Sequence, residues 1–136
     1  MRKKVIYVGI IGVVVLALAA IAMQTDTPEP EVEKSEITLE ADVIMPTKVS
    51  RPGCEKTDEC YIPSVITIKQ GEQVTWKNQD VAFHSVTSGL YAEPTDLFDS
   101  GHMDPEELFT VSFDEKGTFD YFCTLHPWMA GKVLVE

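Results

Sequence analysis

The strongest constraint on the fold is a series of short segments, after residue 36, in which apolar and polar residues alternate. Val74 and Trp76 form one apolar pair, and Phe109, Val111 and Phe113 form a triplet. A period of two is that of a β-strand with one buried face. Turn-forming clusters separate the segments, and no long stretch after residue 23 repeats at the helical period. The pattern therefore predicts an all-β domain and excludes a helical bundle.

The alternation predicts seven strands within residues 37–136. Seven short strands with turns between them favour an antiparallel β-sandwich. The 100 residues of this region are enough for one small domain with a single core. The expected strands cover residues 37–45, 64–69, 73–77, 84–88, 108–113, 118–123 and 132–136.

The first 23 residues have a different composition from the rest of the chain. Residues 5–23 carry no charge and follow three basic residues at positions 2–4. A helix of that length covers about 28 Å, which is close to one hydrocarbon core. Residues 1–23 are therefore expected to be a single-pass membrane anchor. A cleaved signal peptide is the alternative, because Ala20–Ala22 has the pattern of a cleavage site.

Basic residues before an apolar span stay in the cytoplasm, so everything after residue 23 is expected on the extracytoplasmic side of the cell membrane. A cleaved segment would leave the domain secreted or periplasmic. Residues 24–36 are acidic and contain two prolines, which predicts an extended linker. Residues 37–136 are then the folded domain.

Three cysteines is an odd number for a domain expected in an oxidising compartment. Cys54 and Cys60 bracket the polar loop 55–59, a spacing that favours a small disulfide. A two-thiolate metal site at the same two residues is the alternative. Either arrangement leaves Cys123 unpaired.

Cys123, His126 and Met129 follow one another at intervals of three, between the last two expected strands. His84 lies on the inward face of its expected strand, together with Val86. Two imidazoles, a thiolate and a thioether match the trigonal site with a weak axial ligand that electron-transfer copper proteins use. Structural zinc disfavours Met as a ligand, covalent haem requires a C-x-x-C-H motif, and a Cys–His nucleophile leaves Met129 without a role.

The sequence resembles the cupredoxins, and among them the small blue copper proteins of the plastocyanin and amicyanin kind, over residues 64–136. The resemblance implies a Greek-key sandwich that binds one type 1 copper through His84, Cys123, His126 and Met129. The C-x2-H-x2-M spacing is more similar to that of amicyanin than to that of plastocyanin. The motifs that carry the resemblance are Val74–Asn78, Phe83–Val86, Phe98–Gly101 and Gly117–Cys123 running into Gly131–Val133.

Two regions depart from the family pattern. Ser85 follows the first ligand histidine, where the family often has an asparagine that braces the ligand loop. Residues 37–62, which include the Cys54/Cys60 loop, have no counterpart in the family pattern. The resemblance also implies that His126 is the electron port, with Trp128 either beside the port or plugging the end of the sandwich.

The expected function is single-electron transfer between redox proteins by Cu(II)/Cu(I) cycling, with copper storage or delivery as the alternative. An enzyme acting on a small-molecule substrate is not expected, because three histidines cannot build a second copper site when two are ligands. The remaining one, His102, is expected to be exposed. The 22 acidic and 11 basic residues exclude nucleic acid as a partner and favour a redox partner with a basic docking face.

Overall fold

The computed structural model describes residues 40–136. The expected anchor 1–23, the expected linker 24–36 and residues 37–39 of the first expected strand lie outside the described residues. Within residues 40–136 there is no helix with the length and apolar character needed to cross a membrane.

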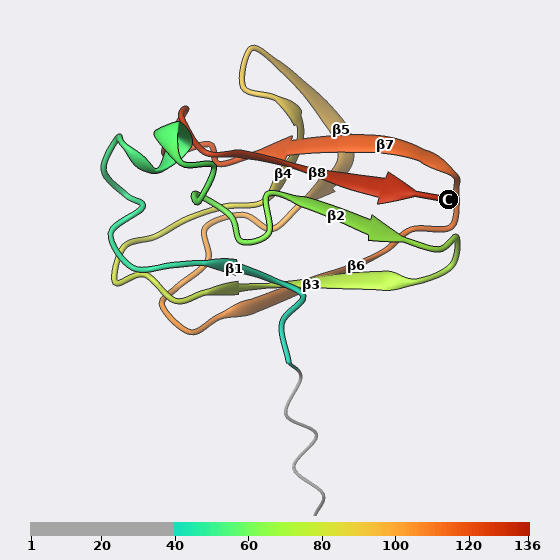
Figure 1. Cartoon of the computed structure of the whole chain (residues 1–136), viewed down its shortest axis with the longest axis horizontal. Coiled ribbons are helices and arrows are strands. Elements are labelled where there is room, and N and C mark those ends of the chain that lie inside the picture. Colours follow the sequence, from blue (N-terminus) through green and yellow to red (C-terminus); the bar gives the residue numbers. More distant parts are fainter. Residues whose placement is uncertain (1–39) are drawn as a thin grey trace, which may run out of the picture. The chain divides into compact units, whose positions relative to one another are not determined.

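The described chain forms a sandwich of two β-sheets (Figure 1). One sheet has the strand order β1-β3-β6, and the other has the order β2-β8-β7-β4-β5. The predicted all-β sandwich is therefore confirmed. The elements are β1 (Val43–Met45), a short 3-10 turn η1 (Cys54–Lys56), β2 (Val65–Ile68), β3 (Gln73–Asn78), β4 (Thr87–Leu90), β5 (Glu93–Asp99), β6 (Leu108–Ser112), β7 (Gly117–Phe122) and β8 (Ala130–Val135).

The sheets are mixed, so the prediction of a purely antiparallel sandwich was wrong in this respect. β1 runs parallel to β3, with Val43 opposite Trp76, and β2 runs parallel to β8, with Ile66 opposite Val133. The pairs β3–β6, β7–β8, β4–β7 and β4–β5 are antiparallel. Alternation in a sequence shows which face of a strand is buried, but it does not show the direction of the neighbouring strand.

Strand β5 was not predicted. Its seven residues include Pro94, and only Phe98 among them is even half-buried. The strand lies at the edge of its sheet and six of its seven residues are exposed, so its sequence carries no clear alternation. The expected strand at 84–88 was also displaced. β4 begins only at Thr87, and His84 instead forms an isolated bridge with Met103.

Trp76 is the centre of the core and is fully buried between the two sheets. Its ring centroid lies 5.3–6.5 Å from those of four other aromatic rings, which come from or next to strands of both sheets. Such contacts join the two layers through large, rigid side chains. The four rings are those of Phe98, Phe109, Phe113 and Tyr121.

In the larger sheet, β8 approaches a side chain near the end of β7 closely. Gly131 of β8 lies opposite Tyr121 of β7, and a Cβ atom at position 131 would overlap the tyrosine ring. Glycine leaves that space open for the Tyr121 ring, which also packs edge-to-face on Tyr61 with centroids 4.9 Å apart. Tyr61 in turn reaches the residues around Cys123, described next.

Candidate metal centre

The loop between β7 and β8 folds back on itself in two consecutive turns. The backbone N–H of His126 donates to the Cys123 carbonyl at 3.3 Å, and that of Met129 donates to the His126 carbonyl at 2.9 Å. The Cys123 N–H then closes the loop on the Met129 carbonyl at 3.1 Å. Successive turns of three residues bring residues 123, 126 and 129 close together in the backbone, as their spacing predicted.

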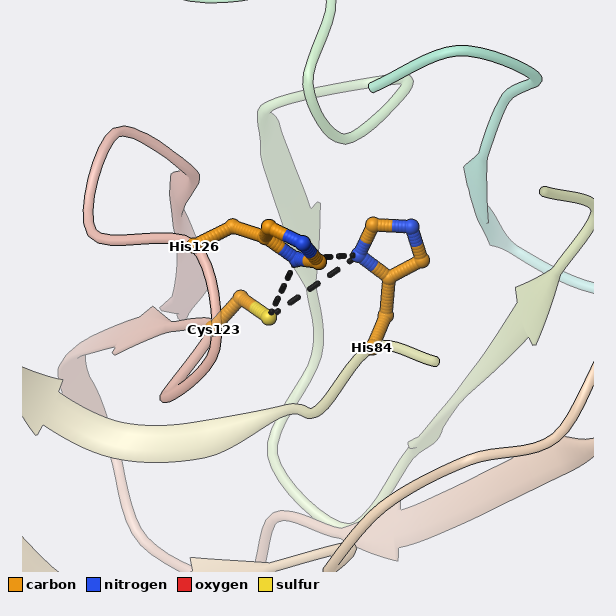
Figure 2. A group of neighbouring side chains, drawn as sticks. All are labelled: His84, Cys123 and His126. Carbon is orange, nitrogen blue, oxygen red and sulfur yellow. Dashed lines mark hydrogen bonds between the residues drawn. The ribbon is translucent and has the colours of Figure 1, made fainter. Parts of the chain in front are cut away.

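Three donor atoms converge beside this loop (Figure 2). The sulfur of Cys123 lies 3.5 Å from Nδ1 of His126 and 3.9 Å from Nδ1 of His84. The two Nδ1 atoms are 3.1 Å apart. All three donor atoms therefore lie within 4.8 Å of one another, a grouping that suits a single metal ion. His84 arrives from a segment 39 residues earlier in the chain than Cys123.

The three side chains differ in their exposure. His84 and Cys123 are fully buried, whereas His126 is partly exposed. Met129 is also fully buried at the end of the loop. His102 is exposed, as expected, and does not belong to the group.

Ser85 braces the site in the position where the family often has asparagine. Its backbone N–H points at the Cys123 sulfur at 3.3 Å, and its hydroxyl accepts the Thr124 N–H at 2.8 Å. The Tyr61 hydroxyl donates to the Ser85 carbonyl at 2.6 Å. Ser85 is fully buried, so these bonds are made away from water. A serine therefore links the His84 segment to the loop between β7 and β8 through both its backbone and its side chain.

The pKa values of the three side chains respond to burial and to one another. Burial disfavours the charged form of His84, but hydrogen bonds with Cys123 and Asp80 outweigh it and raise the His84 pKa. Burial likewise disfavours the Cys123 thiolate, yet bonds from His84 and the Ser85 N–H lower the thiol's pKa. Burial and repulsion from His84 lower the pKa of His126. The site thus stabilises a thiolate, which is the form that binds metals.

Sequence reasoning missed Asp80. Its carboxylate Oδ2 lies 3.1 Å from Nε2 of His84, on the side of the ring that faces away from Cys123. Burial raises the pKa of this carboxyl, but three backbone N–H groups and His84 outweigh burial and hold the pKa well below its usual range. The only signal for Asp80 in the sequence is its position four residues before His84. In a loop, that spacing does not determine whether the two side chains meet.

The second grouping of potential metal ligands among residues 40–136 is Cys54, Glu55 and Cys60. The two cysteine sulfurs are joined in a disulfide, while Cys123 is a free thiol. The predicted disulfide is confirmed, and the alternative of a two-thiolate site is excluded because disulfide sulfurs are not thiolates.

The side chains that converge at Cys123 fit copper. A thiolate favours Cu(I), and imidazole suits both oxidation states of the metal. The lowered pKa of the thiol favours the thiolate that a metal requires, and both Nδ1 atoms face the same point as the sulfur. Harder ions such as magnesium and calcium prefer oxygen ligands, of which this group has none.

Comparison with known proteins agrees with this chemistry. Residues 50–136 match the family described as copper binding proteins, plastocyanin/azurin family. Amicyanin of Paracoccus versutus is 37% identical over 114 residues, which cover 82% of this chain and 77% of that protein. Chloroplastic plastocyanin of Tetradesmus obliquus is 35% identical over 84 residues, which cover 56% of this chain and 58% of that protein.

A solved structure extends the similarity to the fold. A purple cupredoxin from Nitrosopumilus maritimus superimposes with a TM-score of 0.64 at 30% sequence identity, over 71% of this chain and all of that chain. The resemblance inferred from the motifs is confirmed. With both the sandwich and the donor set in agreement, the chain belongs to the plastocyanin/azurin family of copper-binding proteins, and its cofactor is copper.

Proposed function

We propose that this protein is a one-electron carrier in which His84, Cys123 and His126 bind a single copper ion, with Met129 as a weak fourth ligand. The observation that carries the proposal is the convergence of two imidazole nitrogens and one free thiol at the end of a cupredoxin sandwich. The bound copper supplies reversible exchange of one electron between Cu(II) and Cu(I).

The protein holds the donor atoms in place and keeps water away from most of them. Ser85, Thr124 and Tyr61 link the two segments that supply the donors, so little movement is available to the site. His84 and Cys123 are buried, and His126 is the partly exposed member of the group. Its ring is therefore the proposed electron port, and the exposed Leu125 beside it offers an apolar contact to a partner.

A copper titration of the full-length chain tests the proposal. We expect an intense visible thiolate-to-Cu(II) absorption that saturates at one copper per chain, and reversible one-electron reduction without loss of the metal. Ready transfer of the ion to a metal-free acceptor would instead indicate copper storage or delivery. Saturation without the absorption band would contradict the ligand assignment.

The proposed partners are redox proteins that present a basic face. Residues 40–136 contain 17 acidic and 7 basic residues, and such a surface attracts cations over a distance set by the ionic strength. Small inorganic reagents can check this without a known partner. Oxidation of the Cu(I) protein by cationic tris(phenanthroline)cobalt(III) should slow as salt rises, and oxidation by anionic hexacyanoferrate(III) should accelerate. Equal salt dependence for the two reagents would argue against steering by charge.

We also propose that residues 1–23 tether the copper domain to the extracytoplasmic face of the cell membrane. The support is the uncharged run 5–23 behind three basic residues. The full chain should stay with membranes through a high-salt wash, and a chain that starts at residue 24 should be released. Recovery of the full-length product in the soluble fraction, shortened near residue 22, would show that the segment is a cleaved signal instead.

A further inference from the structure

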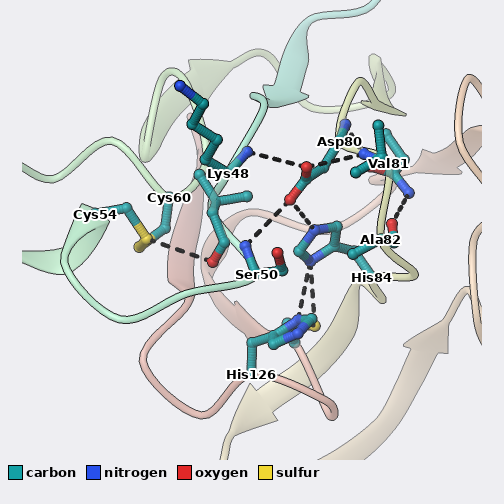
Figure 3. Close-up of polar contacts among 12 residues, drawn as sticks. Lys48, Ser50, Cys54, Cys60, Asp80, Val81, Ala82, His84 and His126 are labelled. Carbon is teal, nitrogen blue, oxygen red and sulfur yellow. Dashed lines mark hydrogen bonds and ion pairs between the residues drawn. A yellow bond between two sulfur atoms is a disulfide. The ribbon is translucent and has the colours of Figure 1, made fainter.

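Asp80 connects His84 to the turn formed by residues 48–50 (Figure 3). Its side chain is 2% exposed. Oδ1 accepts the backbone N–H groups of Lys48 at 2.9 Å and Val81 at 2.8 Å. Oδ2 accepts the Ser50 N–H at 3.1 Å and lies 3.1 Å from Nε2 of His84. A carboxylate has about four acceptor positions, so every one is in use and the group cannot rotate freely.

The same turn also reaches the neighbour of His126. The indole Nε1 of Trp128 donates to the Val49 carbonyl at 3.0 Å. The Trp128 ring packs beside the His126 ring, with centroids 5.3 Å apart. Residues 48–50 therefore contact the surroundings of both histidines, one through Asp80 and the other through Trp128.

The turn is itself held firmly. Val49 is 4% exposed and belongs to the hydrophobic core. The disulfide lies against it, with the Cys54 sulfur 3.9 Å from the Val49 carbonyl oxygen and the Cys60 sulfur 3.8 Å from the Trp128 carbonyl oxygen. Lys48 has a φ of 76°, a backbone conformation that is uncommon for a residue with a side chain. Such a conformation persists only where the surroundings enforce it, and it often marks a functional constraint.

We propose that the turn 48–50 is a positioning element of the copper site, which sets the orientation of both imidazoles through Asp80 and Trp128. The inference rests on the proposed function, in which His84 and His126 are ligands. Groups that bind the outer nitrogen of a ligand histidine fix the plane of its ring and sharpen its affinity for the metal. Here one short turn acts on two ligands that are 42 residues apart in the chain, on His84 through the hydrogen bond of Asp80 and on His126 through the packing of the Trp128 ring.

The test compares Asp80→Asn with Asp42→Asn in the full-length protein. Asp42 also accepts a backbone N–H, from Thr75 at 2.8 Å, but it does not contact the metal-binding group. Competition with the Cu(I) chelator bathocuproine disulfonate should show affinity weakened by roughly 10–100-fold in Asp80→Asn. Asp42→Asn should stay within about twofold of the parent protein. The visible band of the Cu(II) form should also shift in Asp80→Asn and should stay in place in Asp42→Asn.

A second variant keeps the test decisive if Asp80→Asn does not fold, which thermal unfolding of the metal-free protein would reveal. Trp128→Phe preserves an aromatic ring beside His126, although a smaller one, and removes the N–H bonded to Val49. It should also weaken Cu(I) binding and shift the band. Since both side chains act through one turn, the loss in the double variant should depart from the product of the single losses by at least about threefold.

Independent effects of the two variants, or a response of Asp80→Asn equal to that of Asp42→Asn, would overturn the positioning role. These results leave the proposed function intact as long as the parent protein binds one copper with its thiolate band. Failure of the parent protein to show that band would overturn the proposed function itself, so the two failures can be told apart.

Discussion

Replacing Cys123 by serine should abolish the intense visible absorption of the copper-loaded protein. That absorption arises from charge transfer between a thiolate sulfur and Cu(II), and Cys123 is the free thiol of the described chain. A serine hydroxyl is a harder donor and does not ionise at neutral pH, so it cannot replace the sulfur. Cu(I) affinity should fall by more than about 100-fold, because loss of a ligand exceeds the usual effect of losing a group that only supports one.

The control for this variant is the pair Cys54→Ser and Cys60→Ser, which removes two other sulfurs that are joined in a disulfide. The paired variant should retain the band. Absorption spectra and chelator competition, taken on the same samples, check both expectations. An intense band that persists in Cys123→Ser would mean that the sulfur ligand has been assigned to the wrong residue.

Replacing Trp76 by alanine should have the largest effect on folding. The side chain is fully buried and contacts four aromatic rings from both sheets. Removing a buried aromatic side chain of this size lowers the free energy of unfolding by about 3–5 kcal/mol, out of about 5–15 kcal/mol for a typical domain. Urea denaturation of the metal-free protein measures the loss without the added stability that a bound metal would contribute.

Two further variants calibrate that measurement. Trp76→Phe should cost less than Trp76→Ala, because it keeps a ring in the core and removes an indole N–H that has no hydrogen-bond partner within residues 40–136. Leu97→Ala removes a side chain that is 67% exposed and should change stability by less than about 0.5 kcal/mol. Similar losses for Trp76→Ala and Leu97→Ala would show that the two layers are not joined through Trp76.

The sequence predicted correctly the features that depend on residues close together in the chain. The turns of the loop between β7 and β8 agree with the spacing of Cys123, His126 and Met129, and the small disulfide agrees with the short loop between Cys54 and Cys60. Both depend on residues that are close in the chain. Most strands were located to within about two residues for the same reason, since alternation is a property of each strand alone.

Features that depend on distant partners were missed or misjudged. The parallel directions of β1 and β2 depend on strands far along the chain. Strand β5 exists because β4 offers it a hydrogen-bonding edge, and its own exposed sequence gives little sign of it. The sequence shows that Ser85 stands where the family often has asparagine, but not which partners it has, and these are Thr124 and Tyr61.

The sequence by itself determined the class of fold, the family and the set of potential donor side chains, because alternation, motifs and residue chemistry are all written along the chain. Only the tertiary structure decided which residues support those donors. Asp80 acquires its role because folding places its carboxylate between His84 and the turn 48–50. Hydrogen bonds depend on the distance and direction between atoms, and for residues more than 30 positions apart these are set by packing of the whole sandwich.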